Sequence, residues 1–144
     1  MTILVINSGS SSLKFQVIDS ENEEVLAKGV CERIGIDGRF TYRTRTGISL
    51  KEAVPMKNHT QAVHTLLDTL ADPEKGVIKD FREIDVIGHR LVHGGEKFTG
   101  SVVITDEVTQ AMTECNDLAP LHNPANLVGV EACRKLMPDT LMVG

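Results

Sequence analysis

Residues 2–6, TILVI, form a run of apolar and β-branched side chains that constrains the fold more than any other feature. A strand without polar alternation is typical of the interior of a sheet, where both faces are covered. The serine-rich stretch NSGSSSLK follows at once, at residues 7–14. The sequence therefore predicts a central strand that leads directly into a tight turn.

The next part of the chain predicts an antiparallel meander. In SLKFQVID the pattern alternates and places Leu13, Phe15 and Val17 on one side of a second strand. Three further strands are expected before residue 58, with breaks at Gly35 and Gly38.

Helices and strands alternate in the second half of the chain. Asn58 is expected to cap a helix over residues 58–71, with Gln61 completing a capping-box-like pair. The buried stripe of this helix is expected to be Val63, Leu66, Leu67 and Leu70.

Strands are expected over residues 84–95 and 101–104 and a helix from about residue 106, with Val108, Met112 and Cys115 inward. A third helix is expected to have Asn123 as its cap, Pro124 at its first position and Pro138 as its stop.

The last residues, DTLMVG at 139–144, have the character of a buried strand. Such a strand needs flanking elements and a continuing chain, so we expect the sequence to be a piece of a longer protein.

Charge and cysteine content narrow the classes of partner. The 144 residues carry a net charge of −5, which argues against binding nucleic acid or an anionic membrane. No apolar run reaches the length of a membrane span, and MTILVIN lacks the basic region and length of a signal peptide, so we expect none. Three cysteines without framework spacing suit a reduced, cytoplasmic protein, where they serve as packing groups.

The serine-rich turn has the chemistry of a phosphate site. Gly9 would permit positive φ there, and in extended geometry Ser10, Ser12 and Lys14 share a face opposite the apolar side chains. Hydroxyls, backbone N–H groups and an ammonium would then meet without a helix terminus. The stretch lacks the Walker A pattern, and a solvated serine-rich hairpin is the alternative.

Three blocks resemble the acetate kinase family, within the acetate-and-sugar-kinase, Hsp70 and actin superfamily. They are NSGSSSLKF, IGHRLVHGGEKF and LAPLHNPANLVGVEAC, in the family's order and spacing. The resemblance implies an α/β, ribonuclease H-like (actin-like ATPase) fold, a mixed sheet with helices, in which residues 1–144 are the N-terminal domain. The rest of the catalytic site would lie beyond this chain.

The resemblance also implies roles for individual residues. Asn7 matches a magnesium-linked asparagine, which in the wider superfamily is usually an aspartate. Ser10, Ser12 and Lys14 match phosphate-side positions, with Lys14 as a nucleotide contact. On the acceptor side, Arg90 matches the arginine that holds the carboxylate, Val92 and Leu121 line the methyl pocket, and His122 is an active-site histidine.

The implied reaction agrees with the chemistry of these side chains. A carboxylic acid with a pKa of about 4.5 is already an ionised nucleophile at neutral pH, so no strong base is needed. The obstacle is repulsion between the carboxylate and the γ-phosphate, which a site must neutralise while aligning both groups. The guanidinium of Arg90 can engage both carboxylate oxygens, beside the apolar Val86 and Val92 on the same strand face.

His89 and His93 do not form a zinc site by this interpretation. On a strand, residues four apart are separated by about 13 Å, which is too far to share a metal. Both are expected either to pack in the core or to contact site residues without touching the substrate.

We therefore expect an acetate kinase that uses Mg²⁺, ATP and acetate, is cytoplasmic and is a homodimer at full length, as the resemblance implies. The isolated 144 residues are expected to be inactive. A propionate or butyrate kinase is the nearest alternative, and an Hsp70- or actin-like ATPase without a carboxylate acceptor is a second.

Overall fold

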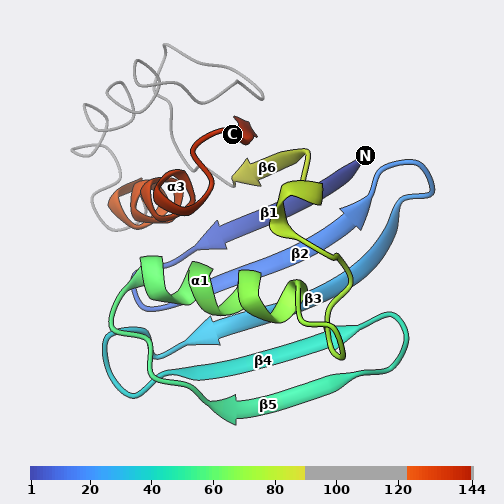
Figure 1. The fold of residues 1–144 in the computed structure, drawn as a ribbon. Helices are drawn as coiled ribbons and strands as arrows, with labels where there is room; N and C mark the ends of the chain where they lie inside the picture. The colour runs from blue at the N-terminus through green and yellow to red at the C-terminus, as the bar shows by residue number, and fades with distance from the viewer. Residues whose placement is uncertain (90–122, 144) are drawn as a thin grey trace.

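The computed structural model describes residues 1–89 and 123–143 (Figure 1). The strand expected at residues 101–104 and the helix expected from residue 106 lie outside these residues. In the part of the chain that is described, no helix is long and apolar enough to cross a membrane.

Seven strands of the described chain form one mixed sheet in the order β5-β4-β3-β2-β1-β6-β7. Their bounds are β1 Thr2–Ser8, β2 Leu13–Asp19, β3 Glu24–Glu32, β4 Arg39–Thr44, β5 Ser49–Ala53, β6 Val86–His89 and β7 Leu141–Val143. Neighbours from β1 to β5 pair antiparallel, which confirms the meander. The expected mixed sheet with helices is also confirmed. The strand expected near residue 140 is β7, the last described strand along the chain.

Strand β1 is central, as predicted. It pairs antiparallel with β2 and parallel with β6, where Ile6 lies opposite His89. Strand β7 continues the parallel part beside β6. Because β1 and β6 run in the same direction, the carboxyl end of β6 lies at the same edge of the sheet as the serine-rich turn after β1.

Helix α1 (His59–Leu70) begins as the sequence predicts. The side chain of Asn58 accepts a hydrogen bond from the Gln61 amide at 3.0 Å. The Gln61 side chain accepts from the Lys57 amide at 2.8 Å, one residue before the position of a capping box. The expected stripe is buried, together with His59 and Ala62.

The described helices cover the same face of the sheet. Figure 1 shows α1 lying across the meander, and α3 (Asn123–Leu136) contacts α1, β1 and β6. Leu4 and Ile6 are therefore buried, whereas Ile3 and Val5 on the other face are only partly buried. The prediction that β1 is covered on both faces is wrong for the described residues, because both helices pack on one side.

The loop between β3 and β4 explains the break in the meander. Gly35 and Gly38 adopt φ of 84° and 71° there, a region that favours glycine. The carbonyl of Gly38 accepts a hydrogen bond from the Val54 amide at 3.2 Å, which ties the loop to the end of β5. The predicted break at these glycines is confirmed.

Helix α3 approaches β1 most closely through Gly129. A Cβ added to Gly129 would lie 2.6 Å from the Ser8 Cβ and 3.8 Å from the Ile6 Cγ2. The helix therefore seats directly on the last residues of β1, immediately before the serine-rich turn. It ends at Leu136, two residues before Pro138. The proposed cap at Asn123 falls among side chains outside those described.

We expect Gly129→Ala to lower the free energy of unfolding by about 1 to 3 kcal/mol, because the added methyl forces α3 away from β1. Alanine is the better helix former by about 1 kcal/mol, so without this contact the substitution would stabilise the chain. Urea denaturation measures the difference. Val128→Ala, at a position 44% exposed on the same helix, is the control and should change stability little. A more stable Gly129→Ala variant would contradict the packing.

His89, the last residue of β6, is a buried polar residue. It is 6% exposed, and its Nε2 has no hydrogen-bond partner in the part of the chain that is described. Burial lowers the pKa of His89 to about 4, so the imidazole is neutral at pH 7. The expected packing role of His89 agrees with this burial, and His93 lies outside the described residues.

The pKa of His89 makes stability depend on pH in a stated direction. An unfolded chain binds a proton at His89 near pH 6.5, whereas the folded chain binds it only near pH 4. The contribution of the neutral His89 imidazole to the free energy of unfolding is therefore fully present above pH 6.5. It is lost as the pH falls toward 4, by up to about 3 kcal/mol. Urea denaturation at pH 7.5 and 4.5 should show a smaller loss for His89→Leu than for the wild type. The exposed His64, replaced by leucine, is the control, and equal losses in all three proteins would contradict the account.

Candidate functional site

The serine turn, defined here as residues 9–12, joins β1 to β2 and is the first candidate site. The Gly9 amide donates to the Ser12 carbonyl at 2.8 Å, which closes the turn. Ser10 and Ser11 are exposed and Ser12 is partly buried. The turn therefore presents small polar side chains to solvent at the end of the central strand.

Gly9 does not adopt the left-handed backbone that glycine permits. Among the described glycines, positive φ occurs at Gly35, Gly38 and Gly47. A Cβ on Gly9 would lie 2.6 Å from the Ser12 Oγ. The space beside Gly9 is thus taken up by the Ser12 hydroxyl.

Backbone carbonyls of the serine turn are bound on the protein side. The Gly9 carbonyl accepts from the His59 Nε2 at 2.8 Å, and the Ser11 carbonyl accepts from the Ile34 amide at 2.9 Å. In contrast, the N–H groups of residues 10–12 donate to no group of the described chain. Successive N–H groups without protein acceptors are the donors from which anion-binding loops are built. The sequence did not reveal His59, because a contact across 50 positions leaves no local pattern.

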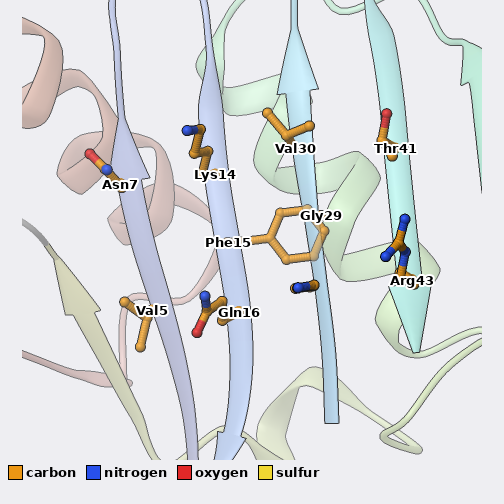
Figure 2. Close-up of a pocket in the computed structure, with 10 residues that line it drawn as sticks. Val5, Asn7, Lys14, Phe15, Gln16, Gly29, Val30, Thr41 and Arg43 are labelled. Atoms are coloured by element: carbon orange, nitrogen blue, oxygen red, sulfur yellow. The ribbon is translucent and has the colours of Figure 1, made fainter. Parts of the chain in front are cut away.

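Asn7 and Lys14 lie directly opposite each other on β1 and β2. Figure 2 shows both side chains on the same face of the sheet. Lys14 is exposed, while Leu13 and Phe15 point into the core, which confirms the predicted alternation. Ser10 and Ser12 precede β2, so the turn sets their direction and the strand periodicity does not.

A hollow of about 550 Å³ lies on this face, beside Asn7 and Lys14 (Figure 2). Lys14, Lys28 and Arg43 line it, and none of the three forms an ion pair within residues 1–89 and 123–143. The hollow is therefore locally cationic on a chain of net charge −5. Lys28 and Arg43 were not predicted as part of a site, although strand alternation and the antiparallel register would have placed them there.

On the core face of the sheet, behind the hollow, β3 carries a glycine opposite Phe15. A Cβ on Gly29 would lie 2.6 Å from the Phe15 Cζ, so the aromatic ring occupies the space of the missing side chain. Phe15 stacks with Phe40 and Tyr42 at centroid distances of 6.1 and 6.5 Å. Burial raises the pKa of Tyr42 to about 12, and its hydroxyl donates to the Lys75 carbonyl at 2.8 Å. The strands that carry the hollow are thus packed from behind by an aromatic cluster, while Lys14, Lys28 and Arg43 line the hollow itself.

The acceptor-side residues predicted from the sequence lie outside the described residues. They are Arg90, Val92, Leu121 and His122. The structure brings Asn7 and Lys14 together beside the serine turn. It also directs β6 toward the same sheet edge, one residue before Arg90.

The buried cysteines behave as packing groups. Cys31 and Cys133 are fully buried, and burial raises the pKa of each thiol to about 12. The thiolate, which is the reactive form, is therefore unavailable at neutral pH. The predicted packing role is confirmed for both, and Cys115 lies outside the described residues.

Comparison with solved structures places this fold among carboxylate kinases. The structure superimposes on acetate kinase from Porphyromonas gingivalis with a TM-score of 0.95 at 46% identity, covering 99% of this chain and 36% of that one. It also matches a propionate kinase from Francisella tularensis with a TM-score of 0.88 at 31% identity, covering 99% and 35%. The shared fold is thus common to kinases named for two different acids.

Sequence comparison agrees with the structural match. Acetate kinases from Agathobacter rectalis and Clostridioides difficile are 59% and 55% identical over the whole of this chain, which spans 36% and 37% of their lengths. The model of the acetokinase family matches residues 2–144. The chain therefore belongs to the acetokinase family.

Proposed function

We propose that the full-length protein is an acetate kinase, which transfers the γ-phosphoryl group of ATP to acetate and gives acetyl phosphate and ADP. Residues 1–144 would be its N-terminal domain. The observation that carries the proposal is the serine turn, whose N–H groups have no acceptor among residues 1–89 and 123–143 and lie next to Asn7 and Lys14. Family membership favours this reaction over that of an Hsp70- or actin-like ATPase.

The phosphate side of the reaction would be held by the serine turn. Ser10 and Ser12 would donate hydroxyl and backbone hydrogen bonds to phosphate oxygens, and the exposed Lys14 would add a positive charge. These groups would bind the leaving diphosphate and align the γ-phosphorus for attack.

Asn7 fits a magnesium ion only as one neutral oxygen donor. No carboxylate lines the hollow beside it in the described chain, and Mg²⁺ usually takes its other ligands from phosphates and water. Asn7 would therefore orient the ion from the protein side, and the ion would supply charge neutralisation between the phosphates.

On the acceptor side, Arg90 would hold the carboxylate, Val92 and Leu121 would contact the methyl group, and His122 would lie beside the transferring phosphoryl group. A carboxylate oxygen then forms a bond to the γ-phosphorus as the bond from that phosphorus to the ADP oxygen breaks. No proton moves, because the acceptor is ionised and ADP leaves as an anion. Catalysis would thus come from positioning and charge neutralisation.

A propionate kinase is the second candidate, because the Francisella tularensis structure shares the fold at a TM-score of 0.88. The two functions would differ in the volume around Val92 and Leu121. The resemblance further implies a cytoplasmic homodimer, which stays a prediction.

Steady-state kinetics of the full-length protein test the proposed acceptor. We expect kcat/KM to be highest for acetate, lower for propionate and lowest for butyrate, measured as trapped acyl phosphate. Arg90→Ala should lower kcat/KM for acetate by about 100- to 1000-fold, because it removes a donor to the reacting carboxylate. Arg82→Ala is the matched control, since Arg82 is exposed and paired with Asp80.

The 144 residues alone should give no acetyl phosphate under the same conditions. A preference for the four-carbon acid would overturn the acetate assignment, and full turnover by Arg90→Ala would remove the role given to Arg90.

A further inference from the structure

His59 reaches the serine turn from the opposite side to the unpaired N–H groups. It is the first residue of α1, and its Nε2 lies 2.8 Å from the Gly9 carbonyl oxygen. A carbonyl can only accept, so the Nε2 must carry the proton in this contact. Its tautomer is thereby fixed by a residue of the candidate site.

The imidazole is held firmly where it makes this contact. His59 is 7% exposed, and the start of its helix is fixed by the Asn58–Gln61 bond at 3.0 Å. A second bond, from the Lys57 amide to Gln61, fixes the chain just before the helix at 2.8 Å. The position of the donor is therefore set by the packing of α1 and not by the serine turn.

The bond to His59 determines where the next N–H group points. In a trans peptide the C=O and N–H groups are directed oppositely within one plane. When the Gly9 carbonyl faces His59, the Ser10 N–H must face away from the protein, where it has no acceptor in the described chain. Rotation of the same peptide would instead present a carbonyl oxygen to an incoming anion.

We propose that His59 is a positioning residue that holds the Gly9–Ser10 peptide with its N–H toward the nucleotide phosphates. This inference rests on the proposed function for the identity of the anion. It assigns His59 no contact with substrate, because the imidazole acts only through the Gly9 carbonyl. A plain core histidine would stabilise the fold equally well but would not control the orientation of an N–H group.

Two substitutions in the full-length protein separate the positioning role from packing. His59→Leu keeps an apolar side chain but removes the donor. His59→Gln keeps an amide N–H at the same number of bonds from the backbone as the imidazole Nε2. His64→Leu changes an exposed histidine of the same helix, paired with Asp68 at 3.1 Å, and is the control.

ADP binding, measured by calorimetry, and the KM values for ATP and acetate are the readouts. We expect His59→Leu to bind ADP about 10-fold more weakly and to raise the KM for ATP similarly, with the KM for acetate unchanged. His59→Gln should recover most of the ADP affinity, and His64→Leu should match the wild type. If His59→Leu does not fold, His59→Met, which is longer and equally lacks the donor, takes its place.

The outcomes separate the inference from the proposed function. A wild type that binds ADP but phosphorylates no carboxylate would refute the function, while weakened ADP binding in His59→Leu would still support the positioning role. Wild-type ADP affinity in a folded His59→Leu or His59→Met variant would overturn the inference, as would a His59→Gln variant that binds as poorly as His59→Leu. A wild type that binds no ADP would overturn both.

Discussion

The orientation of two peptide groups in the serine turn is the constraint on which the candidate site depends. The carbonyls of Gly9 and Ser11 are bound from within the protein, by His59 and by the Ile34 amide. The N–H groups that follow them are left without acceptors in the described chain. Hydrogen bonds that satisfy only the carbonyls turn a short loop into a set of donors, and such a set suits a phosphate. Because the carbonyls of the turn face the core, its N–H groups face outward, where an anion could bind.

The sheet places this set of donors at the carboxyl end of its central strand. Because β1 is central and runs parallel to β6, the turn after β1 and the carboxyl end of β6 share one edge. Helix α3 seats on the end of β1 through Gly129, which leaves that edge well supported. On the other face, Lys28 and Arg43 extend the positive charge of Lys14 across three strands. An acidic chain can therefore attract an anion locally, through a patch that its overall charge conceals.

Local patterns predicted most of the framework. Alternation found the second strand, Asn58 marked the start of α1, and the glycines of the β3–β4 loop marked the break in the meander. These features succeed because each is decided within a few residues of chain. The serines and Lys14 were grouped in the same way because they lie within one short stretch, and their role toward phosphate stays a prediction.

Contacts between distant residues were the part that the sequence could not supply. His59 contacts Gly9 across 50 positions, and a buried histidine looks the same in sequence whether or not it holds a turn. Glycine permits both positive φ and close approach, and only the structure shows that Gly9 lacks positive φ and lies beside the Ser12 hydroxyl. The apolar run of β1 suggested cover on both faces, yet the described helices lie together on one.

A crystal structure of the full-length protein with ADP and acetate would test the central claim most directly. The account predicts phosphate oxygens within hydrogen-bonding distance of the Ser10 and Ser12 N–H groups, with the Gly9 carbonyl still bound to His59. A diphosphate bound away from the serine turn, or a Gly9 carbonyl rotated toward the ligand, would contradict it.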